Sequence, residues 1–578
     1  MEPEKSILVK ETKAQRAERL KAAKNPWESF AEIEEFGRKG FDAIPGDWLK
    51  TYFRWWGVYT QGDGAGVLGG KGGEGNATPY FMLRIRIPNG FIRAHQLRVV
   101  AGIAEKYAHG FADLTVRQNI QLHWITIEAL PVILRTLEEN GLMTKAACGD
   151  DTRNITGCPL AGIDAAEHCD ASPLVFEAQK MLVGPREFYN LPRKFKICVT
   201  GCPVWCSYPE INDVGLTATV RKLNGRREVG FSLRVGGGLS SQPHLAVRVP
   251  AFVRWEQALP VMKGVAEIFR DSDCLRESRE RARLKYLFMK HGWTPEQFLA
   301  ALEERIGFHL DPPEEEDAPA DAFRDHVGFY PQKQPGRFYA GVSVLRGRIS
   351  AVQLASAAEL AERYAGGELR ITGMQNLIIV NVPKQNADPL LAGLEQAGLP
   401  LSASAFRRGA ISCTGTEFCK LAITETKHFT GWLVDELERR LPAFSQHLKI
   451  DVNGCPNGCG QHWIADIGLE GKRMKLDGKM AEAYYFTLGG AVGKHQALSR
   501  QVGYRCAATE VPSAIERLLY FYLAEREEGE TFRAFCARTP DEDLRTSLAG
   551  EPAPSLASLP SILEGESPER ALAAADGA

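Results

Sequence analysis

The chain has 578 residues, and its 70 basic and 72 acidic side chains give a formal net charge of −2. Hydrophobic residues make up 44% and charged residues 25%, which is close to the globular average and excludes disorder of the whole chain. The balanced charge argues against a protein that binds nucleic acid or a membrane surface. No stretch of about 20 uncharged apolar residues predicts a membrane span.

The cysteine content and the first residues indicate the cellular setting. Thirteen cysteines, an odd number, argue against a disulfide framework and favour metal or redox use. Residues 1–24 are charged and helix-friendly, and they lack the apolar core of a secretory signal. We therefore expect a cytoplasmic protein.

The local patterns, taken in chain order, mix strands with helices. Residues 81–88 alternate, with Leu83 and Ile85 on one face of a predicted strand and Arg84 and Arg86 on the other. Apolar residues recur at helical spacing in four later segments, 95–108, 130–141, 353–365 and 388–398. Sheets with helices packed against them are the economical arrangement for such a chain, so we predict an α+β fold.

Two blocks of sequence repeat in the same order. Residues 81–93 and 338–350 are both strand-like, and at the same offset of 257 the pair Gln118-Asn119 falls on Gln375-Asn376. Residues 195–218 then parallel residues 448–471 at an offset of 253, which aligns Cys202 with Cys455, Cys206 with Cys459 and Asp213 with Asp466. A solenoid would repeat every 20–50 residues. The pattern therefore predicts duplication of a unit that contains two modules.

The duplication and the changes in composition together predict the domain organisation. The acidic, proline-rich residues 311–323 form a natural connector between the halves, and the end of the chain has a composition typical of disorder. We predict an N-terminal extension at 1–70, a small module at 71–145, a larger module at 146–310, a second small module at 325–402, a second larger module at 403–548 and a disordered tail at 549–578.

Four cysteines of the second half form the strongest chemical pattern. Cys413 and Cys419 make a C-x5-C pair, and after a gap of 35 residues Cys455 and Cys459 make a C-x3-C pair. Four thiolates suit tetrahedral zinc or an iron–sulfur cube, and four unliganded core thiols are a third possibility. Structural zinc sites prefer tighter pairs than C-x5-C, so the spacing favours the cube.

The segments CTGTEFC and NGCPNGCGQ that carry these cysteines resemble the signature of the ferredoxin-dependent nitrite and sulfite reductase family. The resemblance covers roughly residues 50–545. It implies that each half pairs a ferredoxin-like module with a larger sirohaem-binding α+β module. It also implies one [4Fe–4S] cluster held by Cys413, Cys419, Cys455 and Cys459. Cys459 would also ligate the sirohaem iron and so join the two centres.

The first half retains Cys202 and Cys206, with Cys158 upstream. Its segment RNITGCPLAG supplies only one cysteine, so the C-x5-C pair has no second thiol there. Since members of the family carry one cluster, we expect Cys202 and Cys206 to be relics of the duplication.

Cations on predicted strands are candidates for binding a small oxyanion. Lys194 and Lys196 are two residues apart and so share a strand face, although such a pair is often solvated surface. Arg84 lies on the polar face of residues 81–88, and its counterpart in the repeat is Gly341. The resemblance places Arg84, Arg153 and Lys194 around the substrate, and we add Lys196 to these catalytic candidates.

The same resemblance bears on the substrate. Plant-type nitrite reductases have K-x-N where this chain has Lys194 and Lys196, whereas sulfite reductases have K-x-K. Residues 153–164, 413–419 and 425–427 look like the nitrite branch instead. We therefore expect the six-electron reduction of nitrite to ammonia, with sulfite reduction to sulfide as the alternative.

Arg117 and Gln121 are candidates for holding the sirohaem carboxylates, because a guanidinium can bind a carboxylate through two hydrogen bonds. The alternative is that Arg117 has no role in cofactor binding and is a surface arginine near a turn.

No nucleotide or flavin module is visible, so electrons must come from another protein, which by resemblance is ferredoxin. The basic segment 276–290 could help to dock it or could be a solvated helix face. Two further alternatives are a non-enzymatic scaffold stabilised by zinc and an oxygen-using member of the same superfamily in the corrinoid pathway.

Overall fold

The structure, a computed structural model, describes residues 11–62, 77–204, 206–223, 225–313 and 324–550. These residues form four sheets of five strands each, two in each half of the chain. The predicted connector falls mostly outside the described residues, as does nearly all of the predicted tail.

The smaller module of the first half has the strand order β1-β2-β5-β4-β13. It contains β1 (Val58–Gly62), β2 (Ala77–Ile85), β4 (Phe111–Leu114), β5 (Ile120–Ile125) and the helices α4 (Ala94–Tyr107) and α5 (Leu130–Glu139). Strand β1 lies within the predicted N-terminal extension but joins this sheet. The helices α1 (Lys13–Ala23), α2 (Phe30–Lys39) and α3 (Phe53–Trp55) precede it.

The smaller module of the second half repeats this arrangement in the order β11-β12-β15-β14-β3. Its own elements are β11 (Gly328–Pro331), β12 (Arg337–Val342), β13 (Arg348–Ser350), β14 (Glu368–Ile371), β15 (Leu377–Pro383), α10 (Ala351–Ala365) and α11 (Ala387–Gln396). The four helices predicted from apolar spacing correspond to α4, α5, α10 and α11, so that prediction is confirmed.

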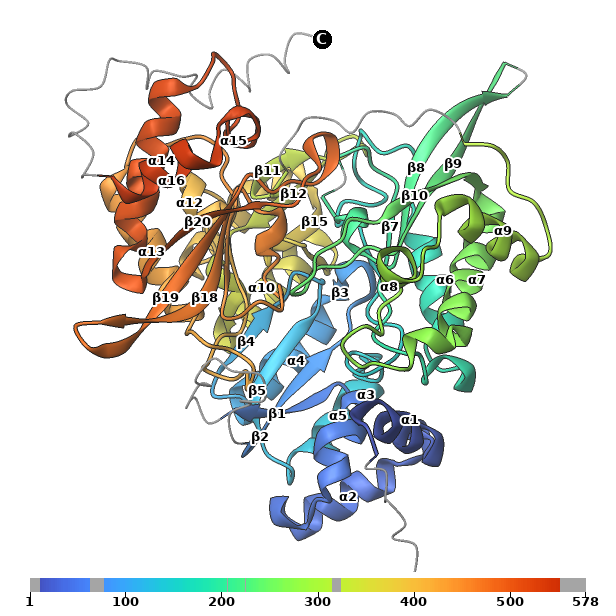
Figure 1. The fold of residues 1–578 in the computed structure, drawn as a ribbon. Coiled ribbons are helices and arrows are strands. Elements are labelled where there is room, and N and C mark those ends of the chain that lie inside the picture. Colours follow the sequence, from blue (N-terminus) through green and yellow to red (C-terminus); the bar gives the residue numbers. More distant parts are fainter. Residues whose placement is uncertain (1–10, 63–76, 205, 224, 314–323, 551–578) are drawn as a thin grey trace, which may run out of the picture.

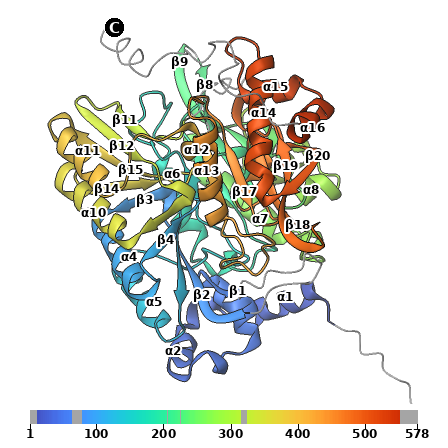
Figure 2. The ribbon, with the colours of Figure 1, turned by 90° about the vertical axis from the view of Figure 1, so that its left-hand side faces the viewer.

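The two smaller modules exchange one short strand each. Strand β3 (Phe91–Arg93) of the first half pairs with β14, and β13 of the second half pairs with β4. Helices α4 and α10 pack together, and one hydrophobic core runs through both modules. In Figure 2 the helices α4, α5, α10 and α11 line one outer side of this pair. The two smaller modules therefore form one body.

Each larger module has three parallel strands continued by an antiparallel pair. The first contains β6 (Thr156–Gly157), β7 (Ile197–Thr200), β8 (Val214–Leu223), β9 (Arg226–Val235), β10 (Val247–Arg254), α6 (Ser172–Leu182), α7 (Ala258–Asp271), α8 (Tyr286–Lys290) and α9 (Pro295–Ile306). The second contains β16 (Ala410–Ser412), β17 (Ile450–Asn453), β18 (Ile467–Leu476), β19 (Lys479–Leu488), β20 (Arg500–Ala507), α12 (Ala405–Gly409), α13 (Lys427–Arg440), α14 (Val511–Glu525), α15 (Phe532–Arg538) and α16 (Asp541–Ala549).

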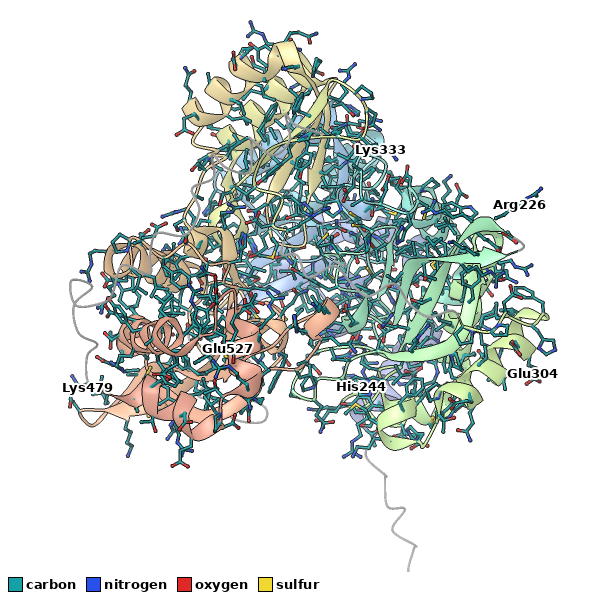
Figure 3. All side chains as sticks on the ribbon, turned by 90° about the horizontal axis from the view of Figure 1, so that it is seen from above. Arg226, His244, Glu304, Lys333, Lys479 and Glu527 are labelled. Atoms are coloured by element: carbon teal, nitrogen blue, oxygen red, sulfur yellow. The ribbon has the colours of Figure 1, made fainter. Side chains whose placement is uncertain are left out.

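The larger modules lie on opposite sides of the paired smaller modules (Figure 1), and each has its own hydrophobic core. Arg226 and Lys479, which match at the repeat offset of 253, mark the ends of the two long hairpins and lie on opposite sides of the molecule (Figure 3). Among the described residues, no helix has the length and apolar character needed to cross a membrane.

The repeated glutamines hold the modules together. Gln118 has φ +57° and donates through Nε2 to Gly157 O at 3.0 Å and to Ile371 O at 3.1 Å. Gln375, with φ +61°, donates likewise to Ser412 O and Leu114 O, both at 3.1 Å. Each glutamine thus links its own smaller module to the larger module of its half and to the other smaller module. The recurrence of this pair in sequence therefore has a structural cause.

Candidate functional site

The four cysteines of the second half come from two loops at the ends of parallel strands. Cys413 follows β16, and Cys455 and Cys459 follow the neighbouring strand β17. Burial and the nearby Cys459 and Cys413 thiols raise the pKa of Cys419 to about 12. Burial and the nearby Cys459 and Cys413 thiols also raise the pKa of Cys455. Thiols so crowded become thiolates only beside a cationic group, which a metal cluster supplies.

The spacing of these sulfur atoms does not suit zinc. Tetrahedral zinc with bonds of about 2.3 Å needs sulfur atoms about 3.8 Å apart. Among the described residues, the one group of three metal-ligating atoms within 4.8 Å of one another lies elsewhere, in the first half. No three of the four cysteines in the second half form so compact a group, which argues against zinc and is compatible with a larger cluster.

The loops that carry the cysteines are fixed by backbone contacts. Gly454 N donates to the Cys413 sulfur at 3.2 Å, and Gly460 N donates to Asn453 Oδ1 at 2.7 Å. Gly458, beside Cys459, has φ +64°, and a Cβ there would lie 3.2 Å from Ser240 N of the first half. The turn with the exposed thiol of Cys459 thus packs closely against the first larger module.

Lys194 and Lys196 lie just before β7 of that first module, and the charge of Cys459 acts on Lys194. Burial and the neighbouring Arg283 lower the pKa of Lys194 to about 7. Burial and Lys194 lower the pKa of Lys196 strongly. Among the described residues, neither ammonium makes an ion pair or a hydrogen bond. The structure thus brings two unpaired cations of the first half near the cysteine set of the second.

Arg84 and Arg153 meet at one backbone carbonyl oxygen, that of Ala147. Arg84 Nη1 donates to Ala147 O and to the Cys148 sulfur, both at 3.1 Å. Arg153 donates to the same Ala147 O at 3.1 Å and to Gly149 O at 2.8 Å. Arg153 also acts electrostatically on Lys194. All four predicted catalytic residues therefore gather on the first half.

The two predicted sirohaem contacts, Arg117 and Gln121, are bound to the protein itself. Arg117 donates to Asn212 Oδ1 and to Asn154 O, both at 2.7 Å, and only its Nε is buried without a partner. With its amide oxygen turned toward Arg84, Gln121 accepts from Nε at 2.9 Å and from Nη2 at 2.6 Å. Gln121 is thus placed to orient Arg84.

Arg86 differs from its predicted position on a polar strand face. It is buried and donates to Thr152 O and Arg153 O, both at 3.2 Å, and to Gln179 Oε1 at 2.5 Å. The alternation of residues 81–88 is real, but the larger module covers the second face of the strand. Arg86 therefore supports the segment that carries Arg153.

Most cations of the basic segment 276–290 are bound within the protein, whereas Arg281 and Lys290 are exposed. Arg276 donates to Glu18 Oε2 at 2.6 Å, and Arg279 holds both carboxylate oxygens of Asp150 at 2.6 and 3.0 Å. Arg283 donates to Asp213 Oδ2 at 2.9 Å, and this oxygen also accepts from Lys196 N at 2.8 Å. Through Asp213, the segment therefore anchors the backbone just before β7, which carries Lys194 and Lys196. The recurrence of Asp213 as Asp466 was the sequence signal for this anchor.

A second network that the sequence did not reveal lies beside the cysteine loops. Asp113 accepts from Arg348 Nε at 3.0 Å and lies 3.2 Å from His123 Nε2 and 3.7 Å from Lys427 Nζ. Burial opposes the ionisation of Asp113, but Lys427, His123 and Arg348 outweigh it and hold its pKa well below its usual value. Phe418, next to Cys419, stacks on the His123 ring at 3.9 Å. The network thus ties the cluster loop to the first smaller module.

Models of two protein-family domains match the chain, each of them twice. The nitrite and sulphite reductase 4Fe-4S domain matches residues 148–310 and 403–549. The nitrite/sulfite reductase ferredoxin-like half domain matches residues 74–140 and 330–397. The chain belongs to the nitrite and sulphite reductase family. The α+β fold expected from the sequence, with a ferredoxin-like module before a larger module in each half, is confirmed.

Relatives with two different names match over most of their length. An assimilatory ferredoxin-dependent nitrite reductase of Haloferax mediterranei is 38% identical over 542 residues, covering 88% of this chain and 89% of the relative. Sulfite reductase [ferredoxin] 1 of Mycolicibacterium paratuberculosis is 36% identical over 541 residues, covering 91% and 95%. The solved structure of the Mycobacterium tuberculosis NirA protein has 35% identity and a TM-score of 0.86, covering 92% of this chain and 97% of that one.

Enzymes of this family are oxidoreductases that use sirohaem and a [4Fe–4S] cluster. The residues present fit both groups. Cys413, Cys419, Cys455 and Cys459 offer the thiols for one cube at more than zinc spacing. The unpaired Lys194 and Lys196 and the orphaned Arg117 Nε offer positive charge for an anionic macrocycle and its ligand.

Proposed function

We propose that this enzyme reduces nitrite to ammonia with electrons from ferredoxin, and that it has appreciable activity on sulfite. The nitrite reaction consumes six electrons and eight protons and yields one ammonium ion and two water molecules. When bound, sirohaem supplies the iron at which the anion is reduced, and the cluster supplies the electrons.

The observation that carries the reduction of a small anion is the unpaired ammonium group of Lys194 near Cys459, with the unpaired Lys196 beside it. The choice of nitrite over sulfite rests on the nitrite-like residues 153–164, 413–419 and 425–427. The repeat supports a functional reading of Lys196. Its counterpart Lys449 also donates its backbone N–H to an aspartate, Asp466, at 2.8 Å, but its ammonium is paired with Asp451 at 3.2 Å. The residue in the first half that corresponds to Asp451 is Cys198, so Lys196 has no such carboxylate. Its side chain is therefore free to take up a small anion, and a bound anion would favour its charged form.

In the proposed enzyme, two arginines bind the anion and a lysine supplies protons. Arg84 and Arg153 hold positive charge at fixed positions, because each is tethered to Ala147 O at 3.1 Å. Arginine stays charged at every physiological pH and so suits anion binding. Lys194, whose pKa is lowered to about 7 by burial and Arg283, is suited to giving up protons near neutral pH.

Two features support ferredoxin as the donor. Relatives at 33–38% identity that are named nitrite reductases carry ferredoxin in their names. Leu421, two residues from Cys419, has 48% of its surface exposed, so the cluster loop reaches the protein surface. A donor that covers Leu421 would come close to the cluster.

The thirteen free cysteines support a reducing, cytoplasmic setting.

The test compares kcat/KM for nitrite and sulfite, with reduced ferredoxin, in the wild type, Lys196→Asn and Lys196→Arg. Sulfite carries up to two negative charges and nitrite one, so the loss of a cation weakens sulfite binding more. We expect the wild type to prefer nitrite, Lys196→Asn to depress sulfite turnover far more than nitrite turnover, and Lys196→Arg to retain the wild-type ratio. A wild type that prefers sulfite would overturn the nitrite assignment. Equal losses for both anions in Lys196→Asn would show that Lys196 does not discriminate.

A further inference from the structure

The first half contains a buried group of thiols at the place that corresponds to the cluster of the second half. Cys158 directly follows β6 as Cys413 follows β16, and Cys202 lies two residues beyond β7 as Cys455 lies beyond β17. Six residues after Cys158, where the second half has Cys419, the first half has Asp164. The C-x5-C pair therefore has a counterpart after all, in the form C-x5-D. The expectation that Cys202 and Cys206 are mere relics overlooked this carboxylate.

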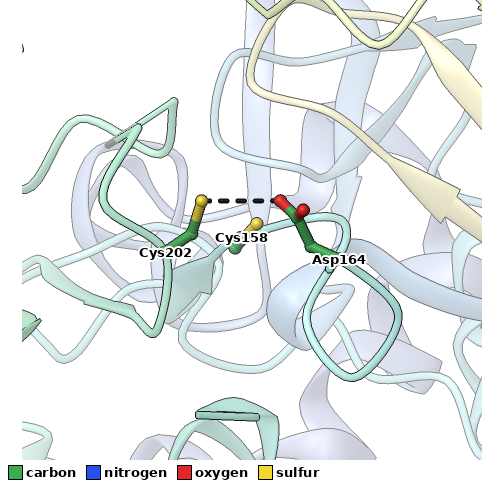
Figure 4. Close-up of side chains that lie close together, drawn as sticks. All are labelled: Cys158, Asp164 and Cys202. Atoms are coloured by element: carbon green, nitrogen blue, oxygen red, sulfur yellow. Dashed lines mark hydrogen bonds between the residues drawn. The ribbon is translucent and has the colours of Figure 1, made fainter. Parts of the chain in front are cut away.

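These side chains converge on one point. Ligand atoms of Cys158, Asp164 and Cys202 all lie within 4.8 Å of one another (Figure 4). The Cys202 sulfur lies 3.5 Å from Asp164 Oδ2, and Cys158 and Cys202 keep 2% and 1% of their surface exposed. Among the described residues, no other set of three potential ligands is so close.

We propose that Cys158, Asp164 and Cys202 bind a single zinc ion, with the Cys206 thiol completing the coordination. Tetrahedral zinc with a thiolate at about 2.3 Å and a carboxylate oxygen at about 2.0 Å places these atoms about 3.5 Å apart. This value matches the separation of Cys202 and Asp164. Cys206 is close enough for its thiol to interact with that of Cys158. The same group is too compact for the cube expected in the second half.

The surroundings resemble the outer layer of a metal site. Arg324 Nη1 donates to Asp164 Oδ2 at 2.6 Å, and Ala166 N donates to Asp164 Oδ1 at 2.9 Å. His326 Nε2 lies 3.3 Å from the Cys206 sulfur. Contacts of this kind orient ligands and balance the charge of several thiolates around one dication.

The position of the site gives the ion a structural task. Arg324 and His326 belong to the start of the second half, whereas all four ligands belong to the first larger module. Cys158 and Cys202 share a small hydrophobic cluster with Tyr339, Ile378 and Val380 of the second smaller module. Zinc here would fix the positions of Asp164 and Cys206, which contact Arg324 and His326, and would so support the packing of the second half on the first larger module. The Asp113 network fastens the opposite pair of modules.

The experiment starts with the wild-type holoenzyme, purified without added zinc. Elemental analysis should find about one zinc per chain in addition to the iron of the cofactors. X-ray absorption at the zinc edge should show a shell dominated by sulfur at about 2.3 Å with one lighter ligand. Cys202→Ser and Asp164→Asn should lower the zinc content several-fold while the iron content and the visible spectrum of the haem remain. Cys274→Ser, which removes a lone, partly exposed thiol, should keep the zinc.

Three results would overturn the proposal. One is a wild type without zinc in which mass spectrometry finds Cys158 and Cys202 as free thiols or as a disulfide. Another is additional iron and acid-labile sulfide, which would indicate a second cluster. The third is zinc with a shell of nitrogen and oxygen alone. The wild-type measurements decide the matter even if Cys202→Ser does not fold.

Discussion

Arg84 and Arg153 donate to the same carbonyl oxygen, that of Ala147, each at 3.1 Å. One arginine comes from a strand of the smaller module and the other from the larger module, so a single backbone atom sets the distance between two cations. Gln121 holds the remaining donors of Arg84. The charges that we propose to bind the anion are thus fixed before substrate arrives, which lowers the cost of binding.

Replacing Gln121 separates two roles for this residue. If Gln121 orients Arg84, Gln121→Leu should raise KM for nitrite roughly 10-fold, because a hydrogen bond to a charged group contributes about 1.5–3 kcal/mol. Sirohaem occupancy, measured from the visible spectrum, should remain at the wild-type level. A loss of haem with an unchanged KM per loaded enzyme would instead support the direct sirohaem contact predicted from the sequence.

The pKa of Lys194 predicts how activity depends on pH. Burial and Arg283 lower this pKa to about 7, so the ammonium loses its charge as pH rises through that value. Since nitrite stays anionic, kcat/KM should fall above about pH 7 in the wild type. Lys194→Arg should move the fall to higher pH, because the guanidinium remains charged. Lys180→Arg, at an exposed position, serves as the control, and an unchanged profile in Lys194→Arg would contradict the assignment.

The buried Asp113 should be essential for stability. Asp113→Asn leaves Arg348 and Lys427 without their shared counter-charge, which should cost about 3–5 kcal/mol of the free energy of unfolding. Thermal unfolding of the holoenzyme measures this loss, and release of the cluster should accompany it because Phe418 stacks on His123. Asp435→Asn, at an exposed position that pairs with Arg407, should change stability by less than about 1 kcal/mol. Equal effects of the two variants would contradict the account.

An exposed leucine tests where electrons enter. Leu421→Glu should weaken ferredoxin-dependent turnover several-fold, because it places a negative charge beside Cys419 where an acidic donor would dock. Turnover with a small chemical reductant should not change. Leu476→Glu, at the end of the β18–β19 hairpin with 45% exposure, is the matched control. If both variants behave alike, the donor does not bind at the Cys419 loop.

The sequence alone predicted most of the fold, because duplication doubles the signal of every element. The alternation in β2 and the apolar spacing of α4 and α10 are local patterns that survive packing. The exchange of β3 and β13 between modules was not predictable, since strands of three residues carry little pattern and their partners are remote in sequence.

The candidate site was predicted less evenly. The four cysteines stood out because their spacing is typical of a cluster site. Lys194 and Lys196 stood out because residues two apart share one face of a strand. Arg283, Asp113 and Asp164 did not, since each acts through a partner more than 35 residues away in sequence. Arg86 was predicted on the polar face of its strand and is instead buried, because the larger module covers that face. The local pattern carries no information about this covering module.

The central claim, that the second half holds the cluster, is tested most directly by iron and acid-labile sulfide analysis. The comparison uses the wild type, Cys459→Ser and its repeat counterpart Cys206→Ser. We predict about five irons and four sulfides per chain in the wild type and in Cys206→Ser, from one four-iron cube and one haem iron. Cys459→Ser should disrupt the coupling of cluster and haem and abolish anion reduction. A wild type with a second cube, or loss of the cluster in Cys206→Ser but not in Cys459→Ser, would contradict the account.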